Sequence, residues 1–340
     1  MKELKLSASK NYNITITDGK DLFIEKCLPY LSGEKVAVIT DSNLMKIYPD
    51  YFEKLLPNKK VFYYTIKAGE ESKDVNNYVG IMNYLVEKEF SRNDGVITFG
   101  GGVVGDIGAF SASTYMRGIN LIAVPTSLLA MVDSSVGGKT AINLDKGKNL
   151  CGTFYQPNGV YIDLSLLKTL PDNELKSGLG EILKYKYVDG KKNISLDKID
   201  EELIYNCLQI KAEIVAEDER EGGKRKLLNF GHTFGHAVEK LNNFTLAHGI
   251  CVAIGIGYAL RFSEKYYNGG KEDFNTYLSL MQKIGVDFSE AYDKYDKDKL
   301  IEIIKYDKKR KGDAIDFVLI DNEKKLRVVP VKIDDIKEYI

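Results

Sequence analysis

The chain has 340 residues, and its 48 lysines and arginines nearly balance its 49 aspartates and glutamates. This balance excludes a general nucleic-acid binder whose affinity depends on a cationic surface, although it leaves room for a local basic pocket. A chain of this length with 44% apolar residues is too large for one ordinary core, so the sequence predicts a globular protein of two domains.

The sequence carries no pattern that points to secretion or to a membrane. The first stretch, MKELKLSASKNYNITITDG, lacks the apolar core of a secretory signal, and the most apolar segment, Gly249–Leu260, is shorter than the roughly 20 residues that cross a bilayer. The four cysteines are scattered without a C-x-x-C pair, which is typical of reduced thiols. We therefore expect a cytoplasmic protein that binds neither nucleic acid nor membrane.

The first half of the chain alternates short apolar strands with amphipathic helices. Strands are predicted at 35–40, 61–66, 95–99 and 119–124, and helices near 43–56 and 73–88. This alternation predicts a parallel, Rossmann-like sheet that is covered on both faces and binds ligands beyond the carboxyl ends of its strands.

Past Pro171 the pattern becomes mainly helical. Five segments have helical periodicity, namely 173–188, 198–217, 230–241, 247–267 and 272–284. Only 316–320 and 326–331 are predicted as strands, joined by a polar turn as a hairpin. The predicted architecture is therefore an α/β domain over 1–169, followed by a mainly α-helical domain over 170–340.

The three histidines of the chain, His232, His236 and His248, fall within one short segment. A single histidine is more often a polar core residue than a ligand, but three together favour a metal site over a polar core cluster or a metal-free acid/base site. Two imidazoles and a carboxylate would suit zinc or iron, with one position open to substrate. His232 and His236 are four residues apart and would share one helix face, so spacing alone pairs these two as ligands.

The carboxylate ligand would have to come from elsewhere in the chain. Glu181, in GLGEILKYKY, is a candidate because it lies on a predicted helix of the same domain, with Lys184 one turn later. An exposed ion pair between these two residues is the alternative interpretation, and spacing alone favours it.

A glycine-rich turn, GGGVVGD over 100–106, follows a predicted strand and opens a predicted helix. Its glycines would let the backbone approach a phosphate, which the N–H groups of the first helical turn would bind. The frame that begins at Gly100 matches G-x-G-x-x-G, which is a weak motif by itself. Its place between strand and helix favours dinucleotide or phosphate binding.

The stretch 125–149 is dense in hydroxyls, glycines and lysines, and we expect a long loop. A loop with so many hydrogen-bond donors beside a proposed cofactor turn more often lines a site than only covers a surface. Its lysines could hold a phosphate or a carboxylate.

Long motifs of this chain resemble the 3-dehydroquinate synthase family of the sugar phosphate cyclase superfamily. They occur in that family's order over about 35–330, as GGGVVGD, ASTYMRGI, VPTSLLAMVDSSVGGKTAIN, GKNLCGTFYQP, LGEILKY, LNFGHTFGHAVE and HGICVAIG. The resemblance implies conversion of 3-deoxy-D-arabino-heptulosonate 7-phosphate into 3-dehydroquinate and phosphate, a lyase reaction of the shikimate pathway to aromatic amino acids. It also implies NAD that is reduced only transiently, one divalent metal ion per subunit (zinc before cobalt) and a homodimer.

The resemblance further assigns roles to individual residues. The implied metal ligands are Glu181, His232 and His248, whereas His236 becomes an acid/base group on the substrate side. The other implied substrate residues are Arg117, Asp133, Lys139, Asn149, Lys184, Lys211, Arg225, Asn229 and Lys308. The implied NAD-binding residues are Asp41, Asn43, Glu70, Lys73, Gly101, Gly102, Val103, Asp106, Thr126, Ser127, Lys139, Lys148 and Thr169. Arg117 is expected to reach the partner's site across the dimer interface.

Two positions depart from the family pattern. Ile250 stands where an acidic residue usually follows the last metal motif, and Lys186 stands where glycine is common. An apolar residue next to a metal ligand could alter the surroundings that tune metal affinity. In the same motif-based assignment, Lys309 is an alternative to Lys308.

Two other functions remain open from the sequence. A sister cyclase would take a sugar phosphate without a carboxylate, and it would not need the cationic residues that this chain keeps at Lys211 and Arg225. A metal-dependent oxidoreductase of the glycerol dehydrogenase type would not need the VDSSVGGKTAIN segment, and it would release NADH.

Overall fold

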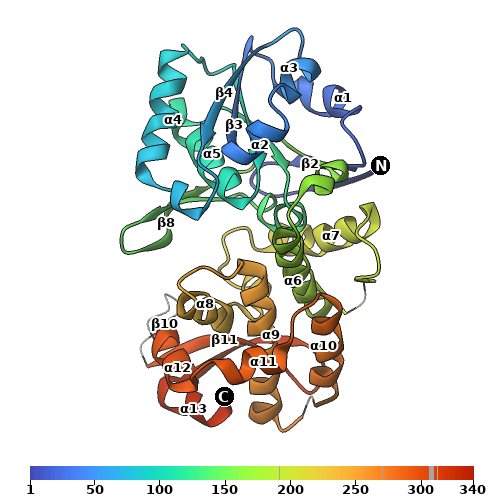
Figure 1. Cartoon of the computed structure of the whole chain (residues 1–340), viewed down its shortest axis with the longest axis vertical. Helices are drawn as coiled ribbons and strands as arrows, with labels where there is room; N and C mark the ends of the chain where they lie inside the picture. The colour runs from blue at the N-terminus through green and yellow to red at the C-terminus, as the bar shows by residue number, and fades with distance from the viewer. Residues whose placement is uncertain (191, 270, 306–309, 312) are drawn as a thin grey trace. The chain divides into compact units, whose positions relative to one another are not determined.

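The computed structural model describes residues 1–190, 192–269, 271–305, 310–311 and 313–340 (Figure 1). They form two compact units, one of Met1–Leu170 with Ile199–Glu219 and one of Pro171–Lys198 with Arg220–Ile340. The division differs from the predicted domains at 199–219, because the sequence pattern places this stretch in the second domain and the structure packs it within the first unit.

Charged residues join that stretch to the first unit. It forms helix α7, Glu201–Glu217, whose first residue lies 2.6 Å from the N-terminal ammonium of Met1. Further along the helix, Lys211 Nζ donates hydrogen bonds to Asp133. Helical periodicity shows that a helix forms but not which core it packs on, so the sequence could not make this assignment.

The first unit is built on a seven-stranded sheet in the order β1-β2-β9-β6-β5-β3-β4. Its strands are β1 Lys2–Leu6, β2 Tyr12–Thr17, β3 Lys35–Asp41, β4 Lys60–Ile66, β5 Gly95–Gly100, β6 Asn120–Pro125 and β9 Gly159–Asp163. All neighbouring strands are parallel except the edge pair β1 and β2. The predicted parallel sheet is confirmed, and its four predicted strands are β3 to β6.

Helices cover both faces of this sheet. They are α1 Phe23–Cys27, α2 Ser42–Ile47, α3 Tyr51–Leu55, α4 Val75–Glu87 and α5 Gly102–Thr114. Figure 1 shows α4 and α5 on one side of β3 and β4, with α1 and α3 on the other. The single helix predicted over 43–56 is two short ones, because Pro49 cannot donate an N–H and disfavours helical backbone at Tyr48, whose φ is −131°.

The predicted loop over 125–149 is mostly regular structure, so that prediction is wrong. Residues Ala130–Ser134 form a π-helical turn, while β7 (Lys139–Leu144) and β8 (Gly147–Phe154) form a separate antiparallel hairpin (Figure 1). Polar side chains are frequent in both strands and β8 also contains glycines, so neither strand has a clear apolar pattern in the sequence. The hairpin holds its donors in fixed positions, as a flexible loop would not.

The second unit packs its helices around α9, His248–Tyr267, most of whose residues are buried. Its other helices are α6 Asp172–Val188, α8 His232–Leu241, α10 Lys271–Lys283, α11 Phe288–Lys294, α12 Lys297–Lys305 and α13 Ile336–Tyr339. Strands β11 Ala314–Ile320 and β12 Leu326–Lys332 form the predicted hairpin, with β10 Arg310–Lys311 beside β11. Among the described helices, none is long and apolar enough to cross a membrane.

Glycines bring α9 into close contact with its neighbours. A Cβ added at Gly180 of α6 would lie 2.1 Å from the carbonyl oxygen of Gly249, and one added at Gly255 would lie 2.1 Å from that of Gly231. A side chain at either position would overlap with backbone, so only glycine permits these distances. Because Gly180, Gly249 and Gly231 each adjoin a predicted metal ligand, the same contacts bring those ligands together.

Candidate active site

Glu181, His232 and His248 come together in the second unit, each from a different helix. The Nε2 atoms of His232 and His248 lie 3.4 and 3.3 Å from the same oxygen, Glu181 Oε1. One donor atom from each residue lies within 4.8 Å of the other two. Three converging protein ligands are typical of a catalytic metal site that keeps one position open.

Burial and neighbouring charges together shift the pKa values in this cluster. Glu181 is buried with Lys184, whose Nζ lies 2.9 Å from Oε2. Burial alone would raise the pKa of the Glu181 carboxyl, but Lys184 and the histidines hold it well below its usual range. Burial lowers the pKa of His232. At His248 the effect of burial is outweighed by Glu181 and Glu239, which raise its pKa to about 10, so a metal would have to displace the proton from this imidazole.

The donor set fits a divalent metal ion. Although the Lys184 ammonium is near, no donor among the described residues meets the buried Glu181 Oε2 with hydrogen-bond geometry. An ionised carboxylate whose Oε2 lacks a hydrogen-bond donor, with its Oε1 placed against two imidazole nitrogens, provides the oxygen and nitrogen ligands that zinc prefers.

His236 lies beside this cluster on the exposed side of α8. Its ring centroid is 5.5 Å from that of His232 and 5.9 Å from that of His248. Its donor atom groups with Glu239 and His248 rather than with Glu181. The geometry thus groups His232 with His248 around Glu181, whereas spacing alone paired His232 with His236.

Two more predicted residues of the second unit, Arg225 and Asn229, lie shortly before His232 in the sequence. Arg225 is buried, and Asn229 donates a hydrogen bond of 2.5 Å to Glu221 Oε1. Glu221 was not predicted, because no regular spacing connects it with Asn229. Lys308, like its alternative Lys309, lies outside the described residues.

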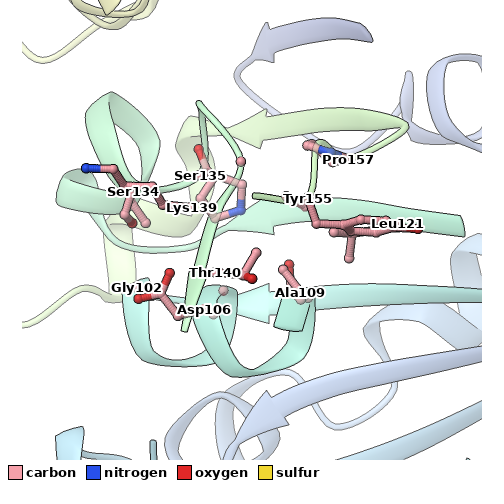
Figure 2. A pocket seen from close by; sticks show the side chains of 18 residues that line it. Gly102, Asp106, Ala109, Leu121, Ser134, Ser135, Lys139, Thr140, Tyr155 and Pro157 are labelled. Atoms are coloured by element: carbon pink, nitrogen blue, oxygen red, sulfur yellow. The ribbon is translucent and has the colours of Figure 1, made fainter. Parts of the chain in front are cut away.

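The glycine-rich turn of the first unit joins β5 to α5. The N-cap residue of α5 is Gly101, which has no side chain to accept from the first turn, so the N–H groups of that turn can bind an anion. Gly101, Gly102 and Asp106 line a pocket together with residues of the π-helical turn and the β7–β8 hairpin. Figure 2 shows Gly102 and Asp106 on one side of this pocket and Ser134 and Ser135 on the other.

A buried lysine connects the predicted NAD residues with the hairpin. Lys73 Nζ pairs with the Asp106 carboxylate and donates to the side-chain oxygen of Asn149. Asn143 of β7, which was not predicted, bridges the same group: its Nδ2 donates to Glu70 Oε1 at 2.7 Å, and its Oδ1 accepts from the Asn149 N–H at 2.9 Å. Burial raises the pKa of Asp106 even though Lys73 counteracts it.

Other predicted NAD residues lie where parallel strands end. Asp41 ends β3 and caps α2, accepting hydrogen bonds from the Asn43 and Leu44 N–H groups at 2.8 and 3.1 Å. Thr169 shares a hydrogen bond of 3.0 Å with Tyr48. The Asp41 carboxylate therefore has a structural role as a helix cap in addition to the role that the resemblance implies.

The end of β6 lies next to the glycine-rich turn. The Thr126 N–H donates to the Gly100 carbonyl at 3.0 Å, and Ser127 follows directly. Val103 is on the first turn of α5, and Lys148 is half-buried on β8. Thr126, Ser127 and Val103 thus lie where the parallel strands β5 and β6 end, which is where such sheets bind ligands.

The predicted substrate residues of the first unit differ in their exposure. Lys211 is buried, with Nζ 2.5 Å from the carbonyl oxygen and 2.9 Å from a carboxylate oxygen of Asp133. Lys139 is exposed and lines the pocket. Arg117 is exposed at φ 68° and follows Met116 at φ 48°. Two successive non-glycine residues in the left-handed region are strained, and such strain is concentrated at functional segments.

Comparison with known proteins agrees with this geometry. The model of the 3-dehydroquinate synthase N-terminal region matches residues 63–177, and that of the C-terminal region matches 178–310. The chain is 41% identical over 335 residues to 3-dehydroquinate synthase of Clostridium acetobutylicum, covering 94% of both chains. It is 39% identical to that of Alkaliphilus metalliredigens, covering 94% of this chain and 92% of the relative.

Solved structures share the fold at lower identity. A 2-deoxy-scyllo-inosose synthase complexed with carbaglucose-6-phosphate, NAD+ and Co2+ superimposes with a TM-score of 0.90 at 24% identity, over 99% of both chains. A probable glycerol dehydrogenase of Sinorhizobium meliloti reaches a TM-score of 0.64 at 13% identity, over 96% of this chain and 94% of that one. The fold is therefore common to cyclases and dehydrogenases, and the sequence matches separate them. On its family matches and its near relatives, the chain belongs to the 3-dehydroquinate synthase family.

Proposed function

We propose that this enzyme converts 3-deoxy-D-arabino-heptulosonate 7-phosphate into 3-dehydroquinate and phosphate, using the Glu181–His232–His248 cluster and the glycine-rich turn. In this reaction a ring hydroxyl is oxidised, phosphate is eliminated, the ketone is reduced again, and the opened ring closes by an aldol step. The observation that carries the proposal is the convergence of one buried carboxylate and two imidazoles in a chain of this family.

Two bound groups would supply chemistry that side chains lack. NAD accepts and returns a hydride, and a divalent metal, zinc or else cobalt, acts as a Lewis acid toward the reacting hydroxyl. Glu181, His232 and His248 would hold the metal. The N–H groups at the start of α5, with Lys73 and Asp106, would hold NAD.

The chain's own residues would orient the substrate and move protons. His236 is exposed beside the ligand cluster, and an imidazole is the side chain best suited to exchange protons near neutral pH. The resemblance assigns Lys139, Lys184, Lys211 and Arg225 to the substrate, and their cationic groups are suited to bind its phosphate and carboxylate. Asp133, Asn149 and Asn229 are the other polar residues that the resemblance assigns to the substrate.

A homodimer in the cytoplasm is also part of this proposal. It is supported by the resemblance and, for Arg117, by the strained backbone of the segment that carries it. An arginine held in an exposed, strained segment is suited to contact a ligand bound by another subunit.

The direct test is incubation of the metal-loaded protein with the heptulosonate phosphate and NAD. We expect phosphate release and carbocycle formation in equal amounts. If the protein turns over a sugar phosphate that has no carboxylate but does not turn over the heptulosonate phosphate, its activity is that of a sister cyclase.

A further inference from the structure

The imidazole of His248 lies between two carboxylates. Its Nε2 is 3.3 Å from Glu181 Oε1, and its Nδ1 is 3.5 Å from Glu239 Oε2. Glu239 is buried on α8, three residues after His236 and seven after His232, so it faces the same side of that helix. The ring thus has one nitrogen toward the ligand cluster and the other toward a charged acceptor.

The two histidines of the cluster differ in what holds their Nδ1 atoms. His232 Nδ1 lies 3.3 Å from the carbonyl oxygen of Phe230, which is backbone only two residues away. His248 Nδ1 faces a side chain from another helix. The orientation of His232 is therefore fixed locally, whereas that of His248 depends on Glu239. Ile250, two residues after His248, offers no polar group that could replace it.

We propose that Glu239 is the positioning residue for His248: its carboxylate accepts the Nδ1–H, so that the Nε2 lone pair is directed toward Glu181 and the metal. A carboxylate in this position fixes the tautomer and makes the imidazole a more basic ligand. The inference rests on the proposed metal site and names a residue that acts on the metal only through His248.

Metal affinity tests this role without relying on turnover. We would measure the dissociation constant for Co²⁺ by competition with a chelator, and the visible spectrum of the bound ion, in the parent, Glu239→Ala and Glu239→Gln. The expected loss of affinity is about 10- to 100-fold for Glu239→Ala, with an altered spectrum. Glu239→Gln keeps an acceptor oxygen without the charge, so its Co²⁺ affinity should lie between that of the parent and that of Glu239→Ala.

Two controls separate this inference from the proposal it rests on. Glu264→Gln, on the same helix as His248 but paired with Arg261, should leave Co²⁺ affinity unchanged. His248→Ala should lose the metal whether or not Glu239 positions the imidazole, because it removes a ligand. If both Glu239 variants bind Co²⁺ with the affinity and spectrum of the parent while His248→Ala loses the metal, the positioning role is wrong and the metal site still stands.

Two further outcomes would also contradict the inference. Retention of metal by His248→Ala would overturn the metal site and the role of Glu239 together. Two Co²⁺ ions in the parent and one in Glu239→Ala would make Glu239 a ligand of a second ion, with His236 and His248, rather than a positioning residue.

Discussion

Asn143 shows how single side chains hold the predicted cofactor residues in place. Its amide joins Glu70 to Asn149, and Asn149 in turn accepts from Lys73, which pairs with Asp106. Lys73, Glu70 and Asp106 were singled out by resemblance, but the residue that connects them was not. Replacing Asn143 would release both Glu70 and the hairpin residue Asn149 from their positions.

We predict that Asn143→Ala weakens NAD binding about tenfold, because two side-chain hydrogen bonds of about 0.5–1.5 kcal/mol each are lost. Calorimetric titration with NAD measures this directly. Asn76→Ala is the matched control, since that asparagine is exposed on α4. An unchanged dissociation constant in Asn143→Ala would show that the bridge does not organise the site.

His232 and His236 are expected to have different functions, one as a metal ligand and the other as an acid/base group. We predict that His232→Ala lowers bound metal, whereas His236→Ala keeps the metal and slows turnover by about 100-fold or more, as expected for a lost acid/base group. Metal content by elemental analysis and steady-state rates distinguish the two effects. Equal metal loss in both variants would favour the pairing of His232 with His236 that spacing alone suggests.

What the sequence reveals about single residues depends on whether a pattern connects them. Clustering of the histidines could be seen directly, and long motifs identified Glu181. Glu239 and Asn143 could not be found this way, because their roles come from contacts between separate helices and strands. Only the folded chain brings Glu239 to His248 and Asn143 to Asn149.

The ligand cluster depends on the close packing of the helices α6, α8 and α9, which carry its residues. Gly180 of α6 contacts the backbone at Gly249 of α9, and Gly255 contacts Gly231 at the start of α8. Each contact sets a distance between helices that carry ligands. A larger residue would push a helix outward, together with the ligand beside it.

We predict that Gly180→Ala destabilises the protein by about 1–3 kcal/mol through overpacking and also weakens metal binding. Thermal unfolding and chelator competition measure the two effects. Gly190→Ala is the control, because a Cβ at Gly190 meets no atom within 4 Å among the non-adjacent residues that the structure describes. Parent-like stability and metal affinity in Gly180→Ala would contradict the claim that this contact sets the site.

Helices and strands whose apolar residues form a clear pattern could be predicted from the sequence, and those without such a pattern could not. The helices α6, α8 and α9 follow the predicted helical segments closely, as do the inner strands β3 and β5. Strands β1 and β2 and the β7–β8 hairpin were missed because polar side chains or glycines interrupt their apolar pattern. Their pairing depends on partners distant in the chain, which local periodicity does not report.

At the scale of the whole molecule, fold alone leaves the reaction open. Cyclases and dehydrogenases have structures that superimpose on this chain. The distinction is chemical: a dehydrogenase converts NAD to NADH in proportion to the substrate consumed, whereas the proposed reaction returns the hydride. Returning it requires that the ketone stays bound until it is reduced.

The most direct test of this account is to follow NADH absorbance and phosphate release together, with the heptulosonate phosphate in excess over the enzyme. The account predicts phosphate over many turnovers with no matching rise in NADH, and at most about one bound NADH per site if reduction is slow. Lys139→Ala or Lys211→Ala should release some intermediate and leave NADH behind. Steady formation of free NADH by the parent, matched to substrate loss, would contradict the cyclase reaction and identify a dehydrogenase.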